Sequence, residues 1–450
     1  MRRPLAGTTL LSGALGALGV VAACAATGAP DTAQEPPVDP GDGGSMVLGD
    51  AEAHPRDAAD EGFGEPPVCT PSGWCRTELP ASDLDLTDVW PVGARAFAAA
   101  GQRFLEWDVV GGWKFIDKKM GFPKLAGAVN VWAPDEDEVF FVLQYNSGLV
   151  GGRARGAIAI VVRGTRPSPP ETTWSWTRSQ IDCQEDGTAL RAKPALWGAS
   201  RDEVYTAICG NVYRLNRNAL VGDGGVNGED GGGDGGITAL DRWKLEYSDG
   251  DPNHSWQAVT GTGTGDVWFV GARAIGPDQC VVLIRKTSEG YSTVVDGVPT
   301  AGEVCVAKPG IAMIPGRLRQ VDAPAKDRLV GVRTLRLGST SSVDDDMVQV
   351  AAVGSEVQLK SASTASTTHG LTSVWGTSLD DLWVLAERLP SGAGSILRAT
   401  SVWDGAGKFE FSTLAINGAP NLERLFRIRG TSNQNLWAVG RDRAYFKSTP

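Results

Sequence analysis

Residues 371–387 read LTSVWGTSLDDLWVLAE, and this short stretch carries the pattern on which the fold depends. An apolar segment ends at Gly376, polar and acidic residues follow, and a second apolar segment begins at Leu382. Short apolar segments bounded by Gly, Ser and Asp are typical of β-strands joined by a tight turn. The stretch therefore predicts a strand, a turn and a second strand.

The same pattern occurs six more times along the chain, in one register. The other copies lie at residues 86–102, 128–144, 193–209, 256–271, 318–333 and 425–440. In each copy a small residue or proline is followed seven places later (six in the first copy) by a large, usually aromatic residue. These large residues are Phe97, Phe140, Tyr205, Trp268, Val330, Trp383 and Trp437. Self-similarity at such spacings indicates a repeat architecture.

One or two further strand-like segments follow most copies, so each unit is expected to form four strands. Seven such units predict an all-β fold, a seven-bladed β-propeller over residues 69–450. The last unit has room for only three strands, whereas residues 73–79 (GWCRTEL) precede the first unit and read as an outer strand. We therefore predict that this N-terminal strand closes the last blade. The repeated large residue is expected to fill the core between adjacent blades.

Two glycine-rich segments need a separate interpretation. Residues 261–271 (GTGTGDVWFVG) suggest a phosphate-binding loop, but a dinucleotide loop requires a helix after it, and here a strand-like segment follows. Gly261 instead matches the small position of the repeat, so the segment is interpreted as a turn between two strands. Residues 218–240 are rich in Gly and Asp and predict a flexible insertion within the third blade.

The N-terminus predicts a targeting signal and a tether. Residues 1–23 combine a basic start with an apolar segment, as signal peptides do. Residues 21–24 (VAAC) resemble the bacterial lipobox, and the resemblance implies cleavage before Cys24 and acylation of its thiol. An ordinary signal peptide with an incidental cysteine is the alternative. Residues 24–68 are rich in Pro, Gly, Asp and Ala, which predicts a disordered tether.

The repeat also resembles a family. Its loose VWG-turn-DDVWAVG pattern is similar to that of the propeller lipoproteins of Gram-negative bacteria, over residues 69–450. The resemblance implies an outer-membrane lipoprotein of the cell envelope, anchored to the membrane through its N-terminal lipid. It implies no particular activity.

The other six cysteines fall in neighbouring pairs along the chain, which favours disulfides in an oxidising compartment. The expected pairs are Cys69 with Cys75, Cys183 with Cys209, and Cys280 with Cys305. Six cysteines allow fifteen connectivities, so proximity in sequence is the basis of this pairing. The CTPSGWC segment lacks the further ligands that zinc needs, and we predict no metal there.

Charge and polar residues limit the partners and the chemistry. The net charge of −11 argues against a nucleic-acid partner, which requires a basic face. Acidic residues in the predicted turns could bind calcium, although ordinary turn chemistry explains them better. These are Asp135, Glu136, Asp137, Glu138, Asp380 and Asp381. His254 and His369 are expected to lie in solvated loops, and nothing in the sequence places either beside a nucleophile.

Two functions remain open. The first is a non-enzymatic surface module that binds a protein or a glycan. The second is an envelope polysaccharide hydrolase or lyase with a carboxylate or metal site in the central channel. The repeat, the predicted anchor and the lack of a recognisable catalytic motif favour the binding module, because function on a propeller depends on residues added to the scaffold.

Overall fold

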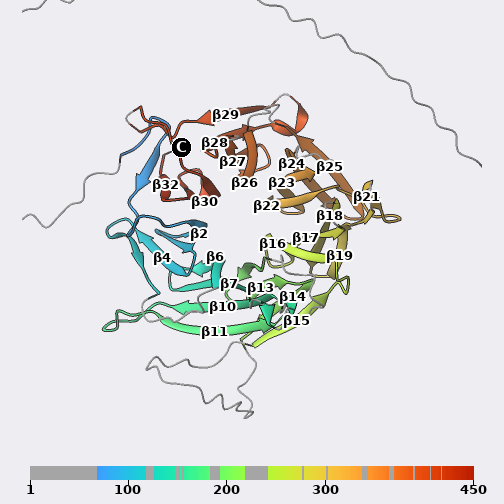
Figure 1. The fold of residues 1–450 in the computed structure, drawn as a ribbon, viewed down its shortest axis with the longest axis horizontal. Helices are drawn as coiled ribbons and strands as arrows, with labels where there is room; N and C mark the ends of the chain where they lie inside the picture. The colour runs from blue at the N-terminus through green and yellow to red at the C-terminus, as the bar shows by residue number, and fades with distance from the viewer. Residues whose placement is uncertain are drawn as a thin grey trace, which may run out of the picture. The chain divides into compact units, whose positions relative to one another are not determined.

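The computed structural model describes most of the chain from residue 68 onward (Figure 1). The described ranges are 68–117, 126–146, 149–150, 153–154, 157–182, 193–217, 242–275, 278–300, 303–336, 343–363, 369–388, 391–405, 407–416 and 418–449. The predicted signal peptide, Cys24, almost all of the predicted tether, Cys183 and the predicted insertion lie outside these ranges.

Seven antiparallel four-stranded sheets form the blades of a β-propeller, as predicted. Blade 1 contains β2 (Leu86–Val92), β3 (Arg95–Ala100), β4 (Arg103–Asp108) and β5 (Gly112–Phe115); blade 2 contains β6 (Ala126–Asp135), β7 (Glu138–Asn146), β10 (Ala157–Thr165) and β11 (Ser175–Asp182). Blade 3 contains β12 (Ala195–Ser200), β13 (Glu203–Ile208), β14 (Asn211–Asn216) and β15 (Arg242–Ser248); blade 4 contains β16 (His254–Gly263), β17 (Asp266–Ile275), β18 (Asp278–Thr287) and β19 (Gly290–Val295).

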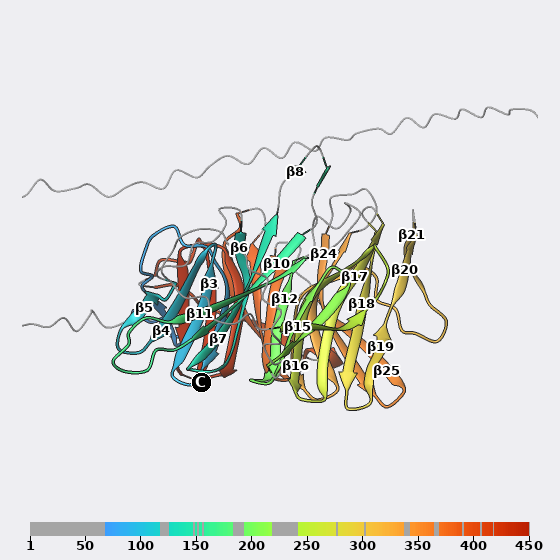
Figure 2. The ribbon, with the colours of Figure 1, turned by 90° about the horizontal axis from the view of Figure 1, so that it is seen from below.

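The remaining blades follow the same plan, with the first strand of each beside the central axis (Figures 1 and 2). Blade 5 contains β22 (Arg317–Ala325), β23 (Arg328–Arg336), β24 (Val343–Val353) and β25 (Glu356–Ala362). Blade 6 contains β26 (His369–Ser378), β27 (Asp381–Arg388), β28 (Gly394–Thr400) and β29 (Lys408–Ser412). Blade 7 contains β30 (Leu425–Ser432), β31 (Asn435–Gly440), β32 (Arg443–Lys447) and β1 (Trp74–Thr77).

Three small elements lie outside the blades. A hairpin of β8 (Leu149–Val150) and β9 (Arg153–Ala154) belongs to the connection between β7 and β10. A second hairpin, β20 (Gly297–Thr300) and β21 (Glu303–Ala307), lies at the rim beside β18 (Figure 1). A 3₁₀ turn, η1 (Val402–Asp404), precedes β29. The helical elements of the described residues include none with the length and hydropathy needed to cross a membrane.

The N-terminal strand closes the ring, which confirms the prediction for residues 73–79. β1 pairs antiparallel with β32, with Trp74 opposite Lys447 and Thr77 opposite Ala444. Trp74 is fully buried, and its ring meets that of Trp383 edge-on at 5.8 Å. The indole Nε1 donates a hydrogen bond to Ser412 Oγ at 3.0 Å. Blade 7 is thus built from both ends of the propeller domain, and β1 covers the edge that β32 would otherwise expose.

The repeated large residue fills the core, also as predicted. All seven of these side chains are buried, and the core clusters join residues of neighbouring blades. One such contact is the stacking of Phe104 of blade 1 on Phe141 of blade 2, with ring centroids 3.9 Å apart. Dispersion and burial of these rings are what hold neighbouring blades together.

The small position of the repeat has a specific packing role. A methyl group on Gly198 would come within 2.6 Å of the Trp132 ring of the preceding blade. A methyl group on Gly261 would come within 2.9 Å of the Trp197 ring and 2.3 Å of the Asp266 carbonyl oxygen. The tryptophan of one first strand therefore packs directly against the small residue of the next. This contact explains the glycine at the start of GTGTGDVWFVG as an inter-blade packing site.

Disulfides connect Cys69 with Cys75 and Cys280 with Cys305, as predicted. The first brackets the entry to β1, and the second attaches the β20–β21 hairpin to β18. Cys209 is also disulfide-bonded. Its predicted partner, Cys183, lies outside the described residues.

Candidate functional site

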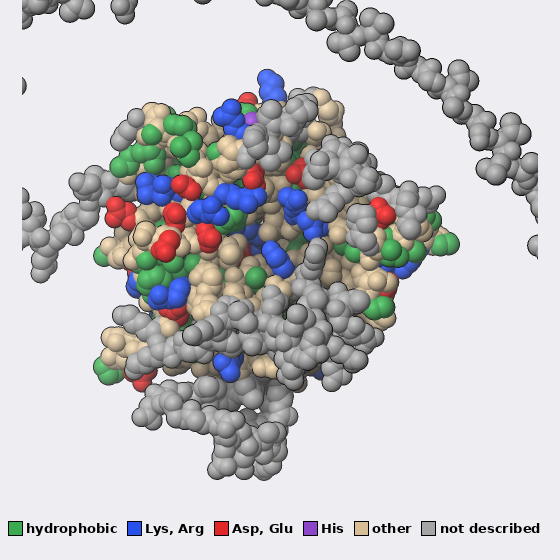
Figure 3. All heavy atoms as spheres, in the orientation of Figure 1, with side chains coloured by type: hydrophobic (Ala, Val, Ile, Leu, Met, Phe, Trp, Pro, Cys, Tyr) green, Lys and Arg blue, Asp and Glu red, His purple; other side chains and the backbone are tan. Residues whose placement is uncertain are grey.

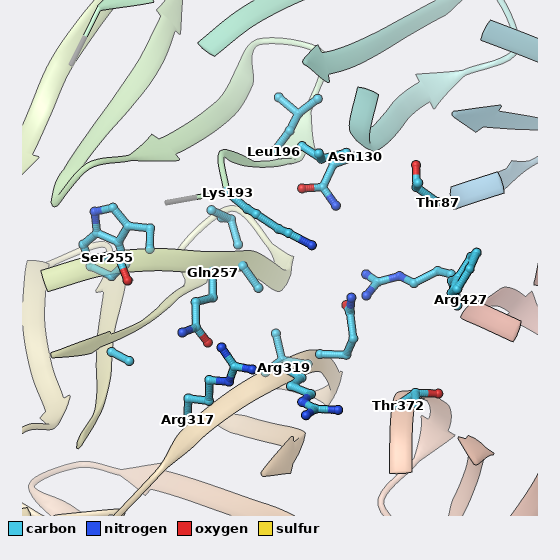
Figure 4. A pocket seen from close by; sticks show the side chains of 18 of the residues that line it. Thr87, Asn130, Lys193, Leu196, Ser255, Gln257, Arg317, Arg319, Thr372 and Arg427 are labelled. Atoms are coloured by element: carbon cyan, nitrogen blue, oxygen red, sulfur yellow. The ribbon is translucent and has the colours of Figure 1, made fainter. Parts of the chain in front are cut away.

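A cavity of about 950 Å³ opens where the first strands of the blades begin. We call this cavity the channel mouth. All seven blades contribute residues to it, including Lys193 next to β12 and Thr372 of β26 (Figure 4). A volume of this size is at the upper end of the range that small-molecule sites occupy.

Six of the seven first strands carry a register shift at the same position of the repeat. The shifts fall between Leu86 and Asp88 in blade 1 and, at the equivalent places, in blades 2, 4, 5, 6 and 7. The residue inside each shift lines the channel mouth: Thr87, Val129, Gln257, Arg319, Thr372 and Phe426. A β-bulge redirects a side chain. The repeat therefore presents one side chain per bulged blade to the cavity, and these side chains differ from blade to blade.

The channel mouth is strongly cationic, although the protein as a whole is acidic. Five cationic side chains and one carboxylate, that of Asp85, line it. The cations are Lys193, Arg317, Arg319, Arg427 and Arg429. They come from blades 3, 5 and 7, so they approach the cavity from alternate blades. Lys and Arg side chains gather around the centre of the face drawn in Figure 3.

Arg427 and Arg429 project from alternate residues of β30 and share one carboxylate of blade 1. Arg427 Nε lies 3.0 Å and Arg429 Nε 3.2 Å from Asp88 Oδ1. Burial and the neighbouring charge of Arg429 lower the pKa of Arg427 to about 10. The guanidinium of Arg427 therefore remains charged at neutral pH in a place where that charge is costly.

Asp88 is itself held in place by blade 2. Its Oδ2 accepts hydrogen bonds from the Val131 backbone N–H at 3.1 Å and from Asn130 Nδ2 at 3.2 Å. Asp322 has the matching structural role between blades 5 and 6, where its Oδ2 accepts the Gly376 N–H at 3.1 Å. Burial raises the pKa of Asp322. Both carboxylates thus connect neighbouring blades.

The turn acids lie at the other end of the first strands, and several of them are ion-paired. Asp135 lies 2.5 Å from Arg201, and Glu136 lies 3.2 Å from Arg95. Asp381 lies 2.8 Å from Arg398, which stands opposite Trp383 in the sheet. Among the described residues there is no group of three or more His, Cys, Asp or Glu side chains arranged to hold a metal. The ion pairs show how these turn acids are used in the fold.

His254 is not solvated, and that expectation was wrong. The side chain is buried, its Nδ1 lies 3.1 Å from Asp249 Oδ2, and its ring lies 4.2 Å from that of Trp256. Arg273 pairs with the same carboxylate at 2.7 Å. A methyl group on Gly271 would lie 2.4 Å from His254 Nε2, so the backbone encloses this nitrogen. The His–Asp pair is therefore part of a buried network of blade 4.

His369 is half-buried and lies 5.4 Å from the Phe411 ring, measured between ring centroids. It begins β26 of blade 6, whereas His254 begins β16 of blade 4. The structure therefore places the two histidines on different blades. Cys24, the predicted lipid attachment site, lies outside the described residues.

The cationic channel mouth was not predicted from the sequence. The signal is present in the aligned copies: RLRQVD (317–322) and LFRIRG (425–430) carry arginines in the strand that most other copies fill with apolar and small residues. A charge in the innermost strand of a propeller faces the channel or a neighbouring blade. Net charge conceals this local excess because acids elsewhere outnumber the bases.

No protein-family model matches the chain, and no curated protein matches its sequence. Similar solved structures include the Cellvibrio cellulosa alpha-L-arabinanase complexed with arabinohexaose, at 13% identity and a TM-score of 0.27, covering 74% of this chain and 96% of that one. A second similar structure, of NanB with Optactamide, is 7% identical with a TM-score of 0.37, and the match covers 82% of this chain and 68% of that one. PorZ, a surface component of the type-IX secretion system of Porphyromonas gingivalis, is 11% identical with a TM-score of 0.30, covering 79% and 56%.

Proposed function

We propose that this chain is a lipid-anchored binding module of the bacterial cell envelope, which engages a glycan or a protein partner at the channel mouth. The observation that carries the proposal is the set of six bulged positions, whose side chains all line one cavity. Between them these side chains include hydroxyl, amide, cationic and apolar groups, a mixture that suits recognition.

The second candidate, a polysaccharide hydrolase or lyase, needs carboxylates that are available to the substrate. Asp88 is buried and Asp322 is half-buried, and each accepts a backbone N–H group of the next blade. Asp88 also faces two arginines. These contacts suit a structural role. Asp85 is the one carboxylate among the described residues that line the cavity, and it pairs with Arg441 at 3.4 Å. Glycoside hydrolysis commonly uses two carboxylates, so the lining favours binding over hydrolysis.

The membrane anchor is the part of the proposal that rests on sequence alone. A signal peptide over residues 1–23, a lipid on Cys24 and a tether over residues 24–68 would hold the propeller near a membrane surface, with the outer membrane as the expected location. Multiple acyl chains on one cysteine bind a membrane firmly, whereas a single chain binds it weakly.

The test is a binding and turnover screen of the purified full chain against neutral glycans, acidic glycans and envelope proteins. Saturable binding without product formation supports the binding module. Product formation from any glycan would replace it with the hydrolase or lyase. If nothing in the panel binds, the proposed function is wrong.

A further inference from the structure

The charge balance around Arg427 indicates which chemistry the channel mouth recognises. Arg427 and Arg429 both form an ion pair with the carboxylate of Asp88. Asp88 is almost fully buried and also accepts two hydrogen bonds from blade 2. Asp322 also interacts electrostatically with both arginines. The excess positive charge belongs to the described lining of the channel mouth, where five cationic side chains face the single carboxylate of Asp85.

The guanidinium of Arg427 has N–H groups that donate no hydrogen bond to the described residues. Only 5% of the residue is exposed, and its Nη1 is enclosed without a hydrogen-bond partner among the described residues. Figure 4 shows its guanidinium directed into the cavity. A buried N–H group without an acceptor destabilises the protein, and more so when the group is charged. A ligand oxygen with negative charge, placed in the cavity, would relieve this cost.

The rest of the cavity offers further positive charge at a distance from Arg427. Lys193 and Arg319 are exposed side chains on blades 3 and 5, and both line the channel mouth. Neither forms an ion pair with a described residue, in contrast to the turn arginines at the other end of the strands. Cations on separate blades suit a ligand that carries more than one acidic group.

Neutral polar groups lie between the cations. Thr87, Asn130, Gln257 and Thr372 line the same cavity. Gln257 Oε1 is enclosed and has no hydrogen-bond donor among the described residues. Amide and hydroxyl groups are the usual partners of ligand hydroxyls, and an unpaired amide oxygen is an acceptor for one. The cavity thus combines groups for acid recognition with groups for hydroxyl recognition.

We propose that the channel mouth binds a short acidic oligosaccharide, with one carboxylate of the sugar at Arg427 and further acidic groups facing Lys193 and Arg319. The inference rests on the proposed binding function and names its ligand class. Single-stranded nucleic acid fits less well, because such sites stack bases on aromatic rings. The aromatic side chains of the cavity are those of His254 and Trp256, which are buried, and Phe426, which is half-buried.

The test is calorimetric titration of the full chain, in detergent, with trigalacturonate. Its fully methyl-esterified form is the matched uncharged ligand, and trimannuronate and a sialylated trisaccharide are the further acidic probes. We expect at least one acidic probe to bind and, for trigalacturonate, the ester to bind on the order of tenfold more weakly or not at all, since charge-assisted hydrogen bonds are lost. Binding should weaken as salt is added.

Variants separate the site from the rest of the surface. Arg427→Gln and the double variant Lys193→Gln/Arg319→Gln should each weaken acidic-probe binding by about tenfold or more. The double variant changes exposed side chains only, so it remains informative if Arg427→Gln fails to fold. Arg178→Gln, on the outer strand β11, is the matched control and should bind as the original protein does.

Three results would overturn the inference. One is equal binding of the acidic and esterified trimers, and another is unchanged binding by the double variant; either leaves the binding module intact. The third is that no acidic probe binds while a neutral glycan, a protein or a deoxythymidine oligomer does. If no probe of any class binds, the proposed function fails together with the inference.

Discussion

Arg427 Nε of β30 lies 3.0 Å from Asp88 Oδ1 of β2, across the junction between the last blade and the first. The two residues are 339 positions apart in the chain and meet because the ring closes. Closure in turn depends on β1, which supplies the fourth strand of blade 7. The Arg427–Asp88 pair at the channel mouth and the closing strand β1 therefore both depend on how blade 7 completes the ring.

Closure by β1 can be tested by removing Trp74. Trp74→Ala deletes a fully buried indole that meets Trp383 and Ser412, and we expect the free energy of unfolding to fall by about 3–5 kcal/mol. A chain starting at Leu84 lacks the whole strand and should be destabilised further or aggregate through the edge of β32. Denaturant unfolding, followed by tryptophan fluorescence, measures both effects.

Two controls accompany this test. Val110→Ala trims a side chain that is 94% exposed and should leave stability unchanged. Deletion of residues 25–66, the predicted tether, should leave the thermal midpoint unchanged as well. If the chain starting at Leu84 melts like the full chain, closure by β1 contributes nothing to stability and this part of the account is wrong.

The packing role of the small repeat position predicts the effect of adding one methyl group. Gly198→Ala places a Cβ within 2.6 Å of the Trp132 ring, and such overpacking costs about 1–3 kcal/mol. Gly127→Ala, in the first strand of blade 2, is the control because a Cβ there meets nothing within 4 Å. Adding Trp132→Leu to Gly198→Ala should recover part of the loss in a double-mutant cycle. Equal stability of the two glycine variants would contradict the packing explanation.

The buried network of blade 4 predicts a pH-dependent contribution to stability. Burial acts to raise the pKa of Asp249, but hydrogen bonds with His254 and Arg273 outweigh it and hold that pKa well below its ordinary value. A depressed pKa in the folded state stabilises the protein above the unfolded value of about 4, and the contribution disappears as the pH falls through the folded pKa.

Asp249→Asn should therefore cost about 3 kcal/mol at pH 7, because it removes one partner of a buried pair. The difference from the original protein should shrink as the pH falls below about 4. Asp404→Asn is the control, since Asp404 pairs with Lys360 at an exposed position. Urea unfolding at pH 7, 4 and 3 measures these differences, and a gap that is constant with pH would refute the role assigned to Asp249.

The proposed lipid anchor makes a prediction for Cys24. Cys24→Ser removes the thiol that acylation requires, so the protein should leave the membrane fraction and lose label from a fatty-acid probe. Cys69→Ser, which breaks a disulfide of the domain, is the control and should keep the label. Label retained by Cys24→Ser would show that the lipid is attached elsewhere or that the anchor has another origin.

The sequence predicts the seven-bladed ring well because the residues that recur in its repeat are the ones that pack between blades. The repeated large residue and the small residue before the turn both pack between neighbouring blades. The spacing of the copies leaves room for four strands in each unit, so seven copies give seven blades. The closing strand followed from counting strands at the two ends of the domain. These features depend on short-range pattern, which a single sequence retains.

The channel mouth could not be read in the same way. Part of its lining comes from one bulged position in each of six blades, and neither the bulge nor the identity of its neighbours follows from the hydrophobic pattern. The buried state of His254 was missed because its partners Asp249 and Arg273 lie on opposite sides of it in the chain and meet through strand pairing. The net charge of the whole chain is negative, so it did not indicate that the channel mouth is cationic.

The most direct measurement is a crystal structure of the protein grown with trigalacturonate. We expect sugar density in the channel mouth, with a carboxylate within hydrogen-bond distance of Arg427 Nη1 and the remaining acidic groups toward Lys193 and Arg319. Sugar bound only at the rim or on the outer strands, with Arg427 untouched, would contradict it.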